Sequence, residues 1–153
     1  MKKVIVAAML FLMPGAALAY DCWDYANRAV RQQRANVWLP CGYGGARWQD
    51  NWQAHFDWCS VVPIATAAAE DVARQNGLKS CLNRAAYVDD CDYYASRAVR
   101  QFRANEAMAC GFSGPRWQAN LAAHKNWCLN VTYAAINQED QARRNSLLLC
   151  VNR

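Results

Sequence analysis

The feature that most constrains the fold of this 153-residue chain is the spacing of its eight cysteines. The first four are separated by 19, 18 and 22 residues, and the last four repeat these three gaps. A shift of 69 residues superimposes residues 22–81 on 91–150 without a gap, with 31 of 60 positions identical. This agreement indicates an internal duplication. The cysteines are Cys22, Cys41, Cys59 and Cys81, then Cys91, Cys110, Cys128 and Cys150.

The N-terminus has the features of a secretory signal peptide. Lys2 and Lys3 precede an apolar run over residues 4–13, and the small-x-small segment 17–19 follows. We predict a signal peptide over residues 1–19, cleaved after Ala19, and therefore a periplasmic or secreted protein. The apolar run is too short to cross a bilayer and no later stretch is long or apolar enough to form a membrane helix, so no transmembrane segment is predicted.

Charge and cysteine usage narrow the function classes. Without Lys2 and Lys3, the 17 basic residues become 15 against 12 acidic ones, a formal charge of +3. This balance is weaker than nucleic-acid binding usually requires. An even number of cysteines in a small exported protein indicates disulfides. The cysteines are widely spaced and form no C-x-x-C pair, so neither a metal site nor another cofactor is predicted.

Helical periodicity predicts an all-α fold of two tandem, disulfide-stapled three-helix repeats. The first helices are expected over 22–38 and 91–108, and the second near Ala46 and Pro115, because proline suits a first helical position. Third helices are expected to begin near Pro63 and Thr132, and the first of them to end at Asn76-Gly77. The predicted domains are repeat 1 over 20–81, a linker over 82–90 and repeat 2 over 91–153.

The predicted helix lengths restrict the disulfide pairing. A helix of about 17 residues is roughly 25 Å long, whereas the Cα atoms of bridged cysteines lie within about 7 Å. Cysteines at opposite ends of one helix therefore cannot pair. In an up-down-up arrangement the first and third cysteines share one end, and the second and fourth share the other. The predicted pairs are Cys22–Cys59, Cys41–Cys81, Cys91–Cys128 and Cys110–Cys150.

Two groups of polar residues on the first helices are retained in both repeats. One group forms a stripe with helical spacing, which is either a binding face or a buried polar seam. The other is a broad basic face, which is either a surface for anionic ligands or the partner of the retained carboxylates of Glu70 and Asp71, with Glu139 and Asp140. The stripe contains Tyr25, Arg28, Gln32 and Asn36 with Tyr94, Arg97, Gln101 and Asn105, and the basic face adds Arg31, Arg34, Arg100 and Arg103.

A glycine-containing loop is our predicted ligand site. Both copies read Gly-x-x-Gly-x-Arg-Trp-Gln and carry an aromatic residue inside the loop. Loops on rigid scaffolds often carry function, and aromatic, arginine and amide groups together suit a sugar. The alternative is a packed corner in which the glycines supply turn geometry. The predicted binding residues are Tyr43, Arg47, Trp48 and Gln49, with Phe112, Arg116, Trp117 and Gln118.

A histidine group on the second helices is the remaining candidate for chemistry. Asn51, His55 and Trp58 share one helical side and recur as Asn120, His124 and Trp127. A catalytic histidine needs a positioned nucleophile or substrate group. No serine is retained nearby, so no catalytic residue is assigned and a hydrogen-bonded structural histidine is favoured.

The sequence thus favours an exported, non-catalytic binding protein with two similar sites, because duplication suits avidity. The expected partner is an envelope glycan or an exported protein. Three alternatives stay open. They are an inhibitor or accessory subunit of a secreted enzyme, a small hydrolase using His55 and His124, and a structural component of the cell envelope.

Overall fold

The computed structural model describes residues 20–84 and 88–151, and within them the chain forms six α-helices and no strand. The predicted all-α fold of two stapled three-helix repeats is confirmed. The predicted signal peptide lies outside the described residues. Repeat 1 contains α1 (Cys22–Trp38), α2 (Trp52–Val61) and α3 (Ile64–Asn83), and repeat 2 contains α4 (Cys91–Ala107), α5 (Leu121–Leu129) and α6 (Tyr133–Val151).

Short acidic side chains fix the beginning of the first helix in each repeat. Asp21 caps α1 by accepting from a backbone N–H two residues later at 2.8 Å. Asp90 caps α4 in the same way. The predicted bounds of these helices are correct to within one residue. The third helices also begin as expected, one residue after Pro63 and Thr132.

The predicted start of the second helices near Ala46 and Pro115 is wrong. Both helices begin about six residues later, directly after Asn51 and Asn120. Each asparagine side chain accepts from the backbone N–H three residues on, at 3.1 and 3.0 Å. Asparagine is among the strongest N-capping residues, so the cap, rather than Pro115, sets the boundary.

The predicted end of the third helix at Asn76-Gly77 is also wrong, because α3 continues to Asn83. A Cβ atom on Gly77 would lie 3.0 Å from the ring of Trp48. The Tyr43 hydroxyl donates to the Gly77 carbonyl at 3.0 Å. Glycine is used here so that two aromatic rings can approach the helix backbone closely, and it does not stop the helix.

All four predicted disulfides are confirmed. Their Cα–Cα distances are 5.5–5.6 Å, within the usual range for a disulfide. In each repeat one bridge ties the first helix to the second, and the other ties the loop after the first helix to the third helix. The pairs are Cys22–Cys59, Cys41–Cys81, Cys91–Cys128 and Cys110–Cys150.

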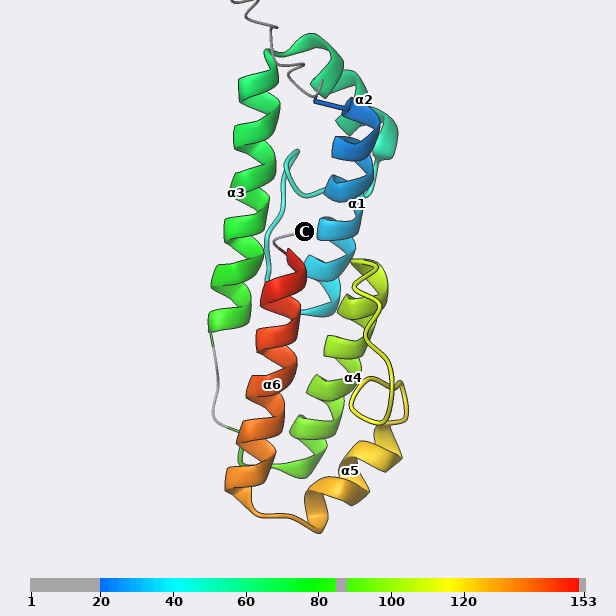
Figure 1. The fold of residues 1–153 in the computed structure, drawn as a ribbon, viewed down its shortest axis with the longest axis vertical. Coiled ribbons are helices and arrows are strands. Elements are labelled where there is room, and N and C mark those ends of the chain that lie inside the picture. Colours follow the sequence, from blue (N-terminus) through cyan, green and yellow to red (C-terminus); the bar gives the residue numbers. More distant parts are fainter. Residues whose placement is uncertain (1–19, 85–87, 152–153) are drawn as a thin grey trace, which may run out of the picture.

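The two repeats stack along the long axis of the molecule and overlap at its middle (Figure 1). There α1 runs antiparallel to α4, and the C-terminal ends of α3 and α6 lie between the two halves. One hydrophobic core continues from repeat 1 into repeat 2. The repeats are therefore joined by packing as well as by the chain. This shared core includes Ala35, Trp48, Leu78, Leu82, Ala104, Trp117, Leu147 and Val151.

The described residues of the predicted linker, 82–84 and 88–90, are held at both ends. Leu82 belongs to α3 and is buried in the shared core. Val88 is fully buried in repeat 2. The side-chain amide of Asn137 accepts from the Val88 N–H at 3.1 Å and donates to its carbonyl at 3.2 Å. These contacts fix where repeat 2 begins relative to its third helix.

Candidate functional site

A fully buried arginine lies at the centre of each repeat. The Arg74 side chain donates from Nε to Gln32 Oε1 at 2.8 Å and from Nη1 to the Tyr25 hydroxyl at 3.1 Å. In repeat 2 the corresponding Arg143 makes the same two bonds, to Gln101 and Tyr94, at 2.6 and 3.2 Å. A buried charge must be hydrogen-bonded to be tolerated. The polar stripe of the first helix provides these partners.

The retained carboxylates extend this network in two directions. Asp71 accepts from Arg28 Nε at 2.9 Å and from Gln32 Nε2 at 3.3 Å, on the side of α1. Glu70 instead accepts from Arg47 Nε at 2.6 Å, on the side of the loop. The stripe and part of the basic face therefore serve internal packing, as the packing interpretation expected.

The conformation of the loop explains which glycines both repeats retain. Gly42 and Gly45 have φ values of 78° and 86°. The equivalent Gly111 and Gly114 have φ values of 78° and 93°. Residues that carry a side chain rarely adopt this left-handed backbone conformation, so these positions require glycine. Gly44 does not have a positive φ, and the equivalent position in repeat 2 is a serine.

The aromatic rings of the loop pack inward. Tyr43 stacks on Trp48 with ring centroids 5.0 Å apart, and Phe112 stacks on Trp117 at the same distance. Both tryptophans are buried, with 8% and 7% of their surface exposed, and belong to the shared core. Of the eight predicted binding residues, these four rings form a packed corner. The other four, Arg47, Gln49, Arg116 and Gln118, stay at the surface.

These four surface residues line two equivalent pockets, which we call the twin pockets. The pocket of repeat 1 has a volume of about 400 Å³ and that of repeat 2 about 250 Å³. All nine lining residues correspond under the 69-residue shift, and only Ala46, replaced by Pro115, differs in type. The linings are Tyr25, Ala46, Arg47, Gln49, Ala54, His55, Trp58, Glu70 and Arg74 in one, and Tyr94, Pro115, Arg116, Gln118, Ala123, His124, Trp127, Glu139 and Arg143 in the other.

One wall of each twin pocket is an exposed indole backed by a buried phenol. The Trp58 and Tyr25 rings lie 5.7 Å apart at an angle of 30°, and the Trp127 and Tyr94 rings lie 5.4 Å apart at 32°. Both tryptophans keep more than a third of their surface exposed, at 36% and 37%. Each pocket therefore offers a rigid, flat apolar surface to a ligand.

The polar side of each twin pocket is formed by three charged side chains in a row, an exposed arginine, a glutamate and a buried arginine. Glu70 pairs with the half-exposed Arg47 and also lies 3.6 Å from Nη1 of the buried Arg74. In repeat 2 Glu139 pairs with Arg116 at 2.7 Å and with Arg143 at 3.3 Å. The exposed guanidinium is thus positioned by a carboxylate that is itself held by a buried arginine. Donors and an acceptor are presented side by side at the pocket edge.

The histidine of each pocket ties α2 or α5 to the loop. His55 Nε2 lies 3.0 Å from the Gln49 carbonyl, and His124 Nε2 lies 3.1 Å from the Gln118 carbonyl. A carbonyl only accepts, so each Nε2 carries the hydrogen. Burial lowers the pKa of both imidazoles, and the bond to the carbonyl partly offsets this. The imidazoles are therefore neutral at pH 7.

Sequence reasoning found the loop half of each twin pocket and missed the rest. It separated Trp58 and His55 from Arg47, and it treated Glu70 only as a source of ion pairs. The structure brings together residues from α1, the loop, α2 and α3. The signal in the sequence that could have grouped these residues is that each of them recurs 69 residues later in the second repeat.

The described residues contain no group of three or more side chains placed to hold a metal ion. None of the described helices combines the length and apolar character that crossing a bilayer requires. The four disulfides are typical of proteins that fold in an oxidising compartment. No family model, curated protein or solved structure matches the chain.

Proposed function

We propose that this chain is an exported, non-catalytic carbohydrate-binding protein whose two equivalent sites are the twin pockets. The observation that carries the proposal is the pocket lining. Eight of its nine residue types are the same in both repeats, and they set an exposed indole beside a positioned ion pair.

The chemistry of the pocket walls suits a pyranose ring. A pyranose has an apolar face of C–H groups and an edge of hydroxyl groups. The Trp58 indole offers a flat surface for the apolar face. Arg47 bonds Glu70 through Nε alone among the described residues, whereas Arg116 donates to Glu139 from both Nε and Nη2 and keeps Nη1 for a ligand. These donors and the Glu70 carboxylate are the partners that the hydroxyl edge requires.

The placement of the pockets supports binding of an extended glycan. The second helices, α2 and α5, lie at opposite ends of the elongated molecule (Figure 1). Each carries the tryptophan and histidine of its pocket. A polymer with repeating sugars can occupy both pockets, and the second contact then forms at a raised effective concentration.

The arrangement supports binding over hydrolysis. Glycoside hydrolysis uses two carboxylic acids across the scissile bond. Each twin pocket is lined by one carboxylate, Glu70 or Glu139. That carboxylate is paired with two arginines, and the histidine Nε2 is already bonded to a backbone carbonyl.

We also propose that the protein is exported through its predicted signal peptide to the periplasm or the medium. The disulfides support an oxidising destination. N-terminal sequencing of the protein recovered from its host tests this point. A mature chain that begins at Tyr20 is expected, and recovery of a chain that retains residues 1–19 would contradict it.

The binding proposal is tested by titrating the oxidised protein with a panel of oligosaccharides and following tryptophan fluorescence and heat. We expect two equivalent sites per chain. Arg47→Ala with Arg116→Ala should weaken binding by about tenfold or more, the loss expected for a charge-assisted hydrogen bond. Arg47→Ala alone should leave one strong site.

Arg34→Ala is the matched control, because Arg34 is also a half-exposed arginine in an ion pair, with Asp50, and does not line a twin pocket. It should bind like the unchanged protein. Equal affinity and stoichiometry in the double variant would sink the proposal.

A further inference from the structure

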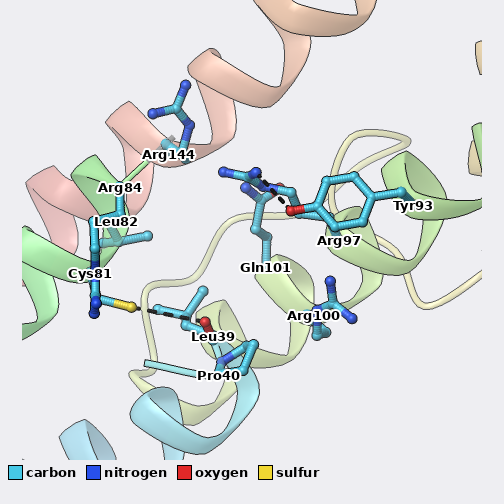
Figure 2. Close-up of a pocket in the computed structure, with 10 residues that line it drawn as sticks. All are labelled: Leu39, Pro40, Cys81, Leu82, Arg84, Tyr93, Arg97, Arg100, Gln101 and Arg144. Atoms are coloured by element: carbon cyan, nitrogen blue, oxygen red, sulfur yellow. Dashed lines mark hydrogen bonds between the residues drawn. The ribbon is translucent and has the colours of Figure 1, made fainter. Parts of the chain in front are cut away.

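A second pair of pockets lies where the two repeats meet, and we call these the junction pockets. Each is built from the arginine-bearing helices of one repeat and the disulfide-stapled end of the other. The first, of about 230 Å³, combines Arg97 and Arg100 of repeat 2 with Leu39 and Cys81 of repeat 1 (Figure 2). The second, of about 200 Å³, has the same construction with the repeats exchanged.

The junction pockets correspond in position, but their described linings differ in charge. The first is lined by four arginines: Arg84, Arg97, Arg100 and Arg144. Among the residues that the structure describes, the second is lined by two, Arg28 and Arg31, and Gln75 stands where the first has Arg144. Aspartate and glutamate are absent from the described linings of both. The duplication thus supplies two pockets of the same construction whose described linings differ at Arg144, which is Gln75 in the second.

The positive charge of the first junction pocket is only partly neutralised. The buried Asp140 is shared by two of the arginines, at 2.9 Å from Arg97 Nε and 3.0 Å from Arg144 Nε. Arg84 donates to the Cys41 carbonyl at 3.3 Å, which is a neutral partner. Arg100 is half-buried and has no hydrogen bond or ion pair within the part of the chain that the structure describes.

We propose that the first junction pocket binds a phosphate group, either free or carried by a saccharide. Guanidinium groups present planar donor pairs that match phosphate oxygens. Several arginines around a recess with apolar walls such as Leu39 concentrate the field on an anion. Arg144 and Gln101 are buried and held by Asp140, which fixes part of the donor set before a ligand arrives. This site is separate from the twin pockets.

Calorimetric titration of the oxidised, full-length mature protein with inorganic phosphate, and in parallel with glucose 6-phosphate, tests the proposal. One site per chain is expected, with an affinity that falls as salt is raised. Tighter binding of glucose 6-phosphate would assign the group to a phosphorylated saccharide, and equal binding would assign it to the free ion. An absence of saturable binding by either probe at low salt would overturn the proposal.

Arg100→Gln is the decisive variant, because Arg100 has no partner in the described residues and its loss should leave the fold intact. It should weaken phosphate binding by about tenfold. Arg31→Gln changes the equivalent position of the second junction pocket and should leave the affinity unchanged. Equal weakening by both variants would show general charge attraction and contradict a defined site.

The twin-pocket variant Arg47→Ala with Arg116→Ala separates this proposal from the sugar-binding one. Inorganic phosphate should bind that variant as it binds the unchanged protein. Loss of phosphate binding in that variant would instead place the anion in a twin pocket.

Discussion

Replacing the buried Arg74 by methionine should destabilise the protein more than any replacement of a surface arginine. Arg74→Met removes the donors to Gln32 and to the Tyr25 hydroxyl, both in buried surroundings. Glu70 and Asp71 keep their pairs with Arg47 and Arg28. The main cost is therefore two buried groups without partners, at about 1–3 kcal/mol each, or about 4 kcal/mol in total.

Urea unfolding with the disulfides oxidised measures this loss as a lower midpoint at an unchanged slope. Arg143→Met should behave alike, since its hydrogen bonds to Gln101 and Tyr94 are equivalent to those of Arg74. The control is Arg47→Met, whose arginine side chain is 49% exposed. It should cost at most about 1 kcal/mol. A loss from Arg74→Met no larger than that of the control would refute the structural role assigned to the buried arginine.

Three further predictions concern the histidines, the disulfides and the helix caps. Burial lowers the pKa of His55 and His124, whereas in the unfolded chain the pKa is about 6.5. Below about pH 6.5 the unfolded state therefore binds more protons than the folded state. The stability that is present above about pH 6.5 is lost as the pH falls through the lower pKa of the folded histidines. His55→Gln with His124→Gln should reduce the drop in melting temperature between about pH 7 and pH 5, and an unchanged drop would contradict this. Cys41→Ser with Cys81→Ser removes a disulfide that spans 40 residues and should lower the free energy of unfolding in urea by about 4 kcal/mol. A loss below about 1 kcal/mol would contradict this prediction. Asn51→Ala should cost about 1 kcal/mol through the lost cap of α2, and calorimetry would count against this if the melting temperature did not change.

The disulfide pairing was predictable because it depends on few quantities. A helix of known rise between two cysteines separates them by more than a bridge can span. The repeated spacing then fixed the same pairing twice. The helix bounds that failed depend on finer balances. A proline favoured a start at Pro115, but the asparagine caps decide the boundary. A glycine favoured an end at Gly77, but that glycine serves the close approach of Trp48.

The twin pockets were half predictable for a related reason. Sequence spacing groups residues of one helix or one loop, so Arg47 and Gln49 were found together. Glu70 and Trp58 reach the same pocket from other helices, and only the packing of three helices brings them there. The junction pockets depend on how two repeats meet, and a single repeat carries no pattern for that contact.

The central claim is that exposed tryptophans of the twin pockets bind sugar while the loop tryptophans stay in the core. Nuclear magnetic resonance of the indole N–H groups tests it directly, because the chain has seven tryptophans and each gives its own signal. During titration with a binding oligosaccharide, the signals of Trp58 and Trp127 should shift together, and those of Trp48 and Trp117 should shift far less. Shifts confined to Trp48 and Trp117, or to tryptophans outside both pockets, would contradict the claim.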